Sequence, residues 1–555
     1  MRSCWWPDVT FERAAHTMWL QDYDPLGSSV LSALVAAIPI IVFLVALTVF
    51  KLTGLKASLI ALVLAVGLGA FVFGLPAPAT ASAVVYGFLG GLWPIGWIVL
   101  MAVWLYRIAV RAGYFDVIRS SISAISEDQR LQVLLIAFCF GGFLEGAAGF
   151  GIPIAICGAL LVNLGFRPLR AAGIALVANA AFGGYGAIGI PVIVGATQGD
   201  VPLTELSRMM VLVIQGIMVF IPVLLVVILD GRRGLRETGG IALAIGFLVS
   251  GLQSVFLWVA GPELVDIIPP LVGMAAMAFL LQFWTPRTIY REAQAPTLEE
   301  LRANHQLTTL GQVVRAWSPF YILSGFILLW SVPAVGEVLA RATVPLSMPF
   351  LHQEIARTAP IVAETTAVDV VWSWGILAAS GTAILFAALF TVLITPSITW
   401  RQTGEELVGA LKQLWAPILM ICMVMAVANV MNFSGMSSSM ALALSAAGGA
   451  FPLLSPIIGW IGVFVTGSVV NNNTLFASLQ AVTAGQIGTS QTLLVASNTA
   501  GGVMAKVISP QSIAIATAAV GERGKEADLT RQVLLYSLGL LAVLCVWVFV
   551  LSLVL

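Results

Sequence analysis

The sequence predicts an all-α polytopic membrane protein with about 12 to 14 transmembrane helices, arranged as two inverted repeats with broken or re-entrant helices at mid-membrane. Three observations lead to this prediction. The 555 residues are 59% hydrophobic and only 9% charged, whereas soluble domains carry about 25% charged residues. Apolar runs about as long as a bilayer-spanning helix recur along the chain. A motif rich in glycine and proline occurs once in each half.

The apolar runs are continuous rather than alternating, so they predict helices and not the strands of a barrel. Clear examples are residues 31–50, 59–75, 211–229, 376–394 and 533–555. Lysine and arginine gather in the loops 51–56, 107–130, 232–236, 285–315 and 523–531, whereas residues 76–86 carry no charge. The positive-inside rule therefore places these basic loops in the cytoplasm and both termini outside.

This topology divides the chain into an extracytoplasmic segment (1–28), a first transmembrane repeat (29–284), a cytoplasmic polar linker (285–315) and a second transmembrane repeat (316–555). The two repeats begin on opposite sides of the membrane, which is the arrangement of an inverted pair. Residues 1–17 lack the apolar core of a signal peptide, and Met18 offers a second start. Our hypothesis is therefore that the start of the protein is misassigned and that translation begins at Met18.

Composition also argues against several other functions. The 26 basic and 26 acidic residues balance, so nucleic-acid binding has no electrostatic support. The five cysteines show no metal or disulfide spacing, and His16, His305 and His352 lie in polar stretches. The sequence contains no GxxxxGK[ST] phosphate loop. We therefore expect no cofactor and no metal, and a membrane enzyme or sensor finds little support.

The repeated motif has matching spacing in its two copies. The first copy consists of Phe143–Gly146, Asn179 and Pro191, and the second of Phe464–Gly467, Asn498 and Pro510. From glycine to asparagine is 33 residues in the first copy and 31 in the second, and from asparagine to proline is 12 in both. Broken apolar segments at matching places in two halves indicate the binding site of a secondary transporter.

The first copy has five glycines and a proline in residues 141–153, which excludes a plain helix. Backbone freed from a helix inside a bilayer must line a cavity or be buried in protein. Helix N-termini at such a cavity suit an anion such as a carboxylate. The alternative is close helix packing through small residues. We favour the cavity because the break recurs in the other half.

Glu145 is the only charged residue between Leu131 and Phe166. A charge at mid-membrane costs about 2.5–3.5 kcal/mol on insertion scales, so an intramembrane acid is a functional candidate. One interpretation makes Glu145 a proton carrier, and the other makes it the structural partner of a buried base.

Lys506 is the first charged residue after a stretch of 93 uncharged residues in the second copy. Its ammonium could hold a substrate carboxylate, pair with Glu145, or snorkel to an interface. The amides Asn179, Asn471, Asn472, Asn473 and Asn498 lie beside the chain breaks, where they could bind a ligand or bridge helices. Glu263 and Asp266, near two prolines, are expected to mark the end of a span at the membrane interface.

Several longer segments resemble the L-lactate permease family. These segments are Gln21–Pro25, Val85–Phe88, Gly91–Ile95, Ile118–Ile122, Phe143–Gly151, Gly165–Leu169, Arg315–Phe320 and Ile508–Ala514. The resemblance covers nearly the whole chain from Met18. It implies a proton symporter of lactate and glycolate in the bacterial inner membrane, with the lipid bilayer, protons and a small hydroxycarboxylate as partners. A homodimer is a further expectation.

The resemblance breaks in two places. Family members usually have an acidic residue after the position of Ser468, where this chain has Val469, Val470, Asn471 and Asn472. Phe182–Tyr185 also differs from the family, whose members more often have proline and valine there. These changes leave a symporter of another organic anion as the alternative, and they leave cation coupling open. The expected site consists of Glu145 for the proton and, for the substrate, Gly146, Gly149, Asn179, Tyr185, Asn472, Asn473, Asn498, Thr499, Lys506, Ser509 and Gln511.

Overall fold

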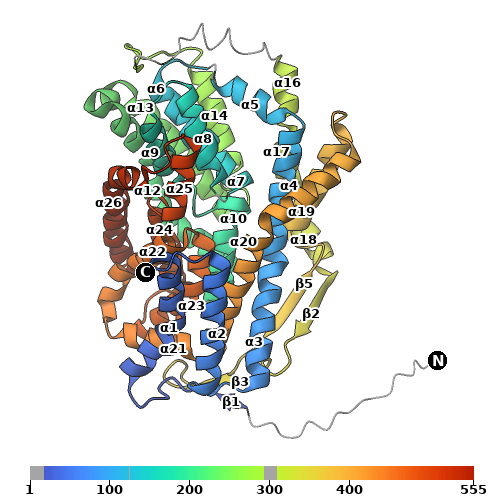
Figure 1. The fold of residues 1–555 in the computed structure, drawn as a ribbon, viewed down its shortest axis with the longest axis vertical. Helices are drawn as coiled ribbons and strands as arrows, with labels where there is room; N and C mark the ends of the chain where they lie inside the picture. Colours follow the sequence, from blue (N-terminus) through green and yellow to red (C-terminus); the bar gives the residue numbers. More distant parts are fainter. Residues whose placement is uncertain (1–17, 124, 150, 293–294, 296–308) are drawn as a thin grey trace, which may run out of the picture.

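The computed structural model describes residues 18–123, 125–149, 151–292, 295 and 309–555, and most of its helices run along the long axis of the molecule (Figure 1). The hypothesis about residues 1–17 and the expectations for His16, His305 and residues 296–308 lie outside the described residues.

The first half is almost entirely helical. Its elements are β1 (Trp19–Leu20), α1 (Ser29–Thr48), α2 (Gly54–Phe71), α3 (Ala77–Gly90), η1 (Gly91–Gly96), α4 (Trp97–Arg111), α5 (Tyr114–Ser123), α6 (Gln129–Gln132), η2 (Val133–Phe140), α7 (Gly141–Ala147), α8 (Ile152–Asn163), α9 (Pro168–Asn179), α10 (Gly186–Gly199), α11 (Leu203–Met210), η3 (Val211–Gln215), α12 (Gly216–Met218), α13 (Ile221–Val259) and α14 (Ile268–Leu280).

The second half adds a small β-structured segment. Its elements are α16 (Leu310–Ala316), α17 (Ser318–Ser331), α18 (Pro333–Ala340), β2 (Thr343–Ser347), β3 (Ile355–Arg357), β4 (Thr366–Ala367), β5 (Val371–Gly375), α19 (Ser380–Ile394), α20 (Trp400–Ser434), α21 (Met436–Ser445), η4 (Gly448–Ala450), α22 (Phe451–Thr466), α23 (Val469–Ile487), α24 (Gln491–Lys506), α25 (Pro510–Ala519) and α26 (Glu526–Ser552). Strand β2 pairs antiparallel with β5, and β3 lies between β1 and β4.

Eight helices in the described part of the chain are long and apolar enough to cross a membrane, or up to nine if the bent pair α17–α18 counts as one span. Four further apolar helices, α8, α10, α14 and α19, have 10 to 17 residues. The number of long helices is lower than the 12 to 14 crossings predicted from run length. One reason is that glycines and prolines divide several of the apolar runs into shorter helices. Another is that residues 203–259 count as one helix although the backbone is non-helical at Gly231.

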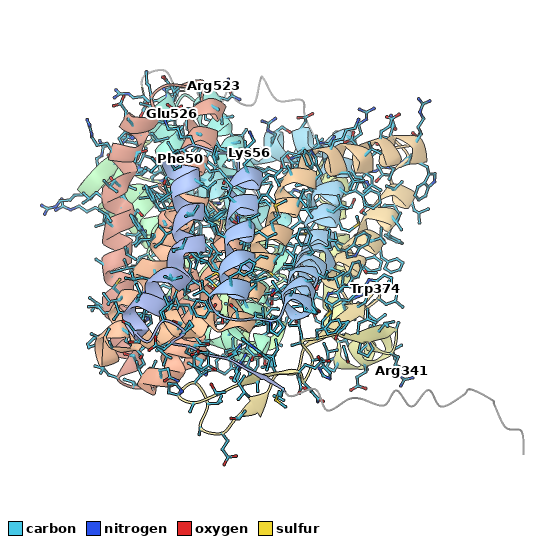
Figure 2. The ribbon with its side chains drawn as sticks, turned by 60° about the horizontal axis from the view of Figure 1, so that its bottom comes forward. Phe50, Lys56, Arg341, Trp374, Arg523 and Glu526 are labelled. Carbon is cyan, nitrogen blue, oxygen red and sulfur yellow. The ribbon has the colours of Figure 1, made fainter. Side chains whose placement is uncertain are left out.

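Several arginines of the first half lie close together at the end of the molecule where Figure 1 places α6 and α13. Arg130 is fully buried there and binds Asp128, Asp230 and Glu237 at 2.7–3.0 Å. We call this region, defined by Arg130, Arg167, Arg170 and residues 521–525, the basic end. In Figure 2, Arg523 and Glu526 lie far from Arg341 and Trp374, which belong to the opposite side.

In each motif copy the chain first reverses direction between two packed helices, which we call the turn-back, and then passes through an interrupted helix. In the first copy the turn-back follows α7, where Gly149 (φ +58°) and Gly151 (φ +81°) adopt left-handed backbone, and α8 packs back on α7. In the second copy it lies at Gly467 (φ +69°), and the Ser468 side chain then caps α23, which packs on α22. Only glycine adopts such angles without strain.

The broken helices follow the turn-backs. Helix α9 ends at Asn179 and the chain resumes as α10, whose first turn has positive φ at Ala187, Ile188 and Gly189. Helix α24 ends at Lys506, and α25 begins at Pro510 with the Ser509 side chain as its N-cap. Helix α10 packs on α23, and α25 packs on α8 and α9. Each copy thus packs its last helix on the other copy, as an inverted pair would; the inverted relation itself stays a prediction.

Glycines allow helices α22 and α24 to approach each other closely, so a larger residue at one of these glycines should reduce stability. A methyl group on Gly501 would collide with the carbonyl oxygen of Pro456, which is backbone and cannot move aside. Gly501→Ala should therefore destabilise the protein by about 1–3 kcal/mol, the usual cost of overpacking. The measurement is the thermal unfolding midpoint in detergent. The control is Gly539→Ala on α26, where nothing lies within 4 Å; an equal effect of both variants would refute the prediction.

Candidate substrate and coupling site

The four chain breaks surround one small cavity of about 80 Å³. The residues that line it are Glu145, Gly149, Gly151, Gly183, Gly186, Ala187, Pro191, Gly467, Ser468, Val469, Val470, Lys506, Gln511, Ser512 and Ile515. A site for one water needs about 10–15 Å³ by this kind of measure. The cavity therefore has room for a few waters or a small molecule.

A buried ion pair forms one wall of this cavity. The Lys506 ammonium contacts Oε1 of Glu145, and the two side chains are 11% and 2% exposed. The Asn179 amide donates to Oε2 of Glu145 at 2.8 Å. Each carboxylate oxygen of Glu145 thus has a hydrogen-bond or ion-pair donor. The cavity presents one acid and one base to whatever enters it.

Glycines let the backbone approach this ion pair. A methyl group on Gly186 would collide with the Glu145 carboxylate, and one on Gly183 would lie 3.0 Å from the Lys506 Cδ. Both glycines lie at the break between α9 and α10. The break therefore brings main chain of the first copy against a lysine from the second, 361 residues away from Glu145 in sequence.

Several predicted site residues lie at or next to the cavity. Glu145, Gly149, Lys506 and Gln511 line it, and Asn179 binds Glu145. Ser509 has a structural contact, because its hydroxyl caps α25 and donates to Ser512 at 2.8 Å.

The other predicted residues do not line the cavity. Asn473 donates to Thr499 at 2.9 Å and to the Pro191 carbonyl at 2.7 Å, and Asn498 donates to Asn473 at 2.9 Å. Asn472 donates to the Asn498 carbonyl at 3.3 Å. These buried contacts join α23 and α24 and reach α10. Tyr185 accepts a hydrogen bond from Gln215 at 2.9 Å. A substrate-binding role for these residues stays a prediction.

Asp266 lies close to Glu145 and Lys506, although it does not line the cavity. As expected, it lies between two apolar helices, α13 and α14, where it is only 1% exposed and packs against Gly146. Its place at the membrane interface stays a prediction. A methyl group on Gly146 would lie 2.7 Å from the Asp266 carbonyl group. Oδ1 of Asp266 accepts from Gln253 at 2.9 Å, and Oδ2 has no hydrogen-bond partner among the described residues. The signal in the sequence was an acidic residue between two apolar segments. Its contact with Gly146 depends on packing that the sequence does not reveal.

The sequence of this chain is similar to that of known proteins along nearly its whole length. The sequence pattern described as L-lactate permease matches residues 32–555. The chain belongs to the L-lactate permease family. Its relatives include the L-lactate permease of Halalkalibacterium halodurans, 46% identical over 97% of this chain and 100% of that one. The L-lactate permease and the glycolate permease GlcA of Escherichia coli are each 43% identical, over 94% and 96% of this chain and 96% and 98% of their own lengths.

Two solved transporter structures also resemble the permease. The YdaH transporter of Alcanivorax borkumensis matches with a TM-score of 0.45 at 16% identity, over 84% of this chain and 86% of that one. MtrF of Neisseria gonorrhoeae matches with a TM-score of 0.47 at 14% identity, over 86% and 84%. The family and the apolar helices make the chain a multi-pass membrane permease and not an enzyme, and its homologues support lactate and glycolate transport.

Proposed function

We propose that the permease imports L-lactate, D-lactate or glycolate together with a proton across the bacterial inner membrane. The observation that carries this proposal is the Glu145–Lys506 ion pair at the wall of a small cavity where the chain breaks of both copies meet. The names of the homologues support the substrate class. The homodimer remains an expectation beside this proposal.

Charge balance explains how one proton would accompany one substrate. In the empty site the Glu145 carboxylate and the Lys506 ammonium neutralise each other. A substrate carboxylate adds a second negative charge for a single ammonium, and an uncompensated buried charge costs several kcal/mol. A proton on Glu145 removes that surplus and releases Lys506, which can then bind the substrate carboxylate. Substrate and proton would thus enter together, with no net charge moved.

The remaining cavity wall suits the rest of a small hydroxy acid. Ser468 and Gln511 offer donors and acceptors for a 2-hydroxyl group. Val469, Val470 and Ile515 give an apolar surface against which a methyl group could pack. A cavity of about 80 Å³ favours monocarboxylates of two or three carbons over larger anions.

The alternative is a different organic anion, either larger or coupled to a cation, because Val469 and Val470 line the cavity at the place where the resemblance to the family leads us to expect an acid. Competition against labelled lactate in proteoliposomes separates the two. We expect glycolate and both lactates to compete, and uptake to follow an imposed proton gradient. Uptake that follows a sodium gradient, or competition only by larger anions, would favour the alternative.

Asp266 gives a prediction that tests which acid carries the proton. The groups that act on it electrostatically are Glu145, Lys506 and Tyr185, and the one cation among them is already paired with Glu145. An ionised Asp266 would be a buried charge with an unpartnered oxygen, so we expect it to stay protonated. Asp266→Asn, which keeps the shape and the neutral state, should therefore retain proton-driven uptake within about threefold of the wild type. If this variant keeps substrate exchange but loses proton-driven accumulation, Asp266 and not Glu145 is the carrier.

A further inference from the structure

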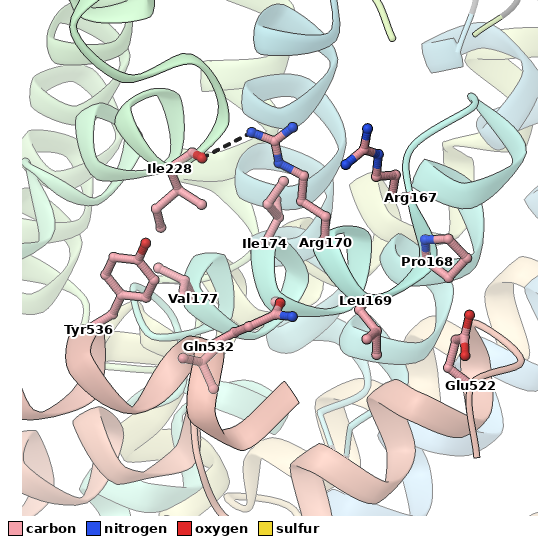
Figure 3. Close-up of a pocket in the computed structure, with 12 residues that line it drawn as sticks. Arg167, Pro168, Leu169, Arg170, Ile174, Val177, Ile228, Glu522, Gln532 and Tyr536 are labelled. Atoms are coloured by element: carbon pink, nitrogen blue, oxygen red, sulfur yellow. Dashed lines mark hydrogen bonds between the residues drawn. The ribbon is translucent and has the colours of Figure 1, made fainter. Parts of the chain in front are cut away.

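A second, much larger cavity of about 810 Å³ lies at the basic end, between α9, α13 and α26 (Figure 3). It is ten times the volume of the cavity beside Glu145, and the two share no lining residue. We call it the α9–α26 groove. Nothing in the proposed transport cycle uses it.

The groove has a basic rim and an apolar floor. Gly173, Ile174, Val177, Ile228 and Val533 form the floor, whereas Arg167 and Arg170 stand at the rim and Gln532 and Tyr536 add polar groups from α26. Figure 3 shows both guanidinium groups on the rim side, above Ile174 and Val177. Such a lining suits a molecule with a polar head and an apolar tail.

Among the residues that the structure describes, the positive charge at the rim is incompletely neutralised. Arg170 is held by Glu292 at 2.9 Å, by the Tyr290 hydroxyl at 3.1 Å and by carbonyl oxygens of α13. The same Glu292 is 3.8 Å from Arg167, whose side chain is 83% exposed. One carboxylate therefore serves two guanidinium groups. Glu522, the acid that lines the groove, is already paired with Lys525 at 2.6 Å. The rim thus retains positive charge.

The groove lies on the side of α9 that faces away from the ion pair. Arg170, Ile174 and Val177 follow each other at the spacing of one helix face. Asn179, which binds Glu145, comes two residues after Val177, about 200° round the helix. The groove is therefore not the route by which substrate reaches Lys506. It opens beside α26, of whose apolar window only 33% is buried inside the protein, as expected for a helix that faces lipid.

We infer that the α9–α26 groove is a binding site for an anionic phospholipid. The phosphate lies between Arg167 and Arg170 and accepts hydrogen bonds from Gln532 and Tyr536, and an acyl chain lies over Ile174, Val177 and Val533. Basic pockets between transmembrane helices on the cytoplasmic side are suited to such headgroups. The apolar floor favours a lipid over a free phosphate, because a small anion would leave that surface uncovered.

The test is a binding measurement on the purified full-length protein, which is independent of transport and of its coupling. Phosphatidylglycerol is titrated in detergent, and bound lipid is followed by native mass spectrometry and by the unfolding midpoint. We expect phosphatidylglycerol to bind and to raise the midpoint, whereas phosphatidylcholine with the same chains and free glycerol phosphate do not. Equal effects of glycerol phosphate would overturn a lipid site, and equal binding of phosphatidylcholine would overturn recognition of the charge.

The variant Arg167→Gln tests whether the lipid binds in the groove. This side chain is exposed, so it can be changed without removing the contacts of Arg170 with Tyr290 and Glu292. It should weaken phosphatidylglycerol binding roughly fivefold, the effect of about 1 kcal/mol per basic residue near a membrane surface. The matched control is Arg401→Gln on α20, whose side chain is 89% exposed and pairs only with Glu405 at 3.2 Å among the described residues. Unchanged binding to the Arg167 variant, or the same loss in both variants, refutes the groove as the site.

Discussion

Glu145→Gln is expected to abolish the accumulation of substrate driven by a proton gradient while leaving exchange of labelled for unlabelled substrate. The glutamine amide keeps the shape of a protonated Glu145 but cannot release a proton. Lys506 is then permanently free for a substrate carboxylate, so a loaded carrier still forms. The empty carrier, however, would hold an unpaired buried lysine, which makes its return across the membrane unfavourable.

The measurement compares two assays of one reconstituted variant: uptake into proteoliposomes with an alkaline interior, and counterflow without a gradient. We expect at least a tenfold loss in the first and a loss of less than threefold in the second, since the return step is needed only for net uptake. Glu405→Gln is the control, because Glu405 is half exposed on α20 and pairs with Arg401. Full proton-driven uptake by the Glu145 variant would show that the carrier assignment is wrong.

Lys506→Ala should have the largest effect on substrate affinity. Removing one partner of a buried charge pair costs about 2–5 kcal/mol, so the half-saturation concentration should rise at least tenfold. The variant should also be less stable, because Glu145 is left buried with only Asn179 as a partner. Lys412→Ala, an exposed lysine on α20, should change neither property.

The double variant Glu145→Gln, Lys506→Ala distinguishes the effect of Lys506 on protein stability from its effect on substrate binding. Because it removes both charges, it should recover much of the unfolding midpoint lost in Lys506→Ala. Its affinity for substrate should remain low, since no cation is left to hold the carboxylate. An unchanged affinity in either lysine variant would remove Lys506 from the substrate site.

Sequence reasoning found Glu145 and Lys506 because each is an isolated charge in a long uncharged stretch. It could not decide whether Lys506 meets Glu145, because their contact depends on two chain breaks that fold against each other across 361 residues. The sequence placed the asparagines beside the breaks, where they could bind a ligand or bridge helices. Their spacing could not show that Asn473, Asn498 and Thr499 bind one another and not the cavity.

Asp266 is a residue whose buried contact could not be predicted from the sequence. Its neighbours in sequence, Glu263 and two prolines, are typical of the end of a span, yet the short connection between α13 and α14 folds inward against Gly146. The paired strands β2 and β5 were likewise not predicted, since their register depends on partners more than 20 residues apart. Patterns of charge and glycine thus point to a candidate site in this chain, and the packing around it requires the structure.

We propose that one substrate anion moves with one proton through the site of Glu145 and Lys506. The most direct measurement is lactate uptake by the reconstituted wild type, with a pH gradient and a membrane potential imposed separately. We predict that an alkaline interior drives accumulation, whereas a membrane potential alone does not, because the loaded site carries no net charge. Uptake that does not depend on the pH gradient, or that is driven by the membrane potential alone, would contradict this coupling of one proton to one substrate.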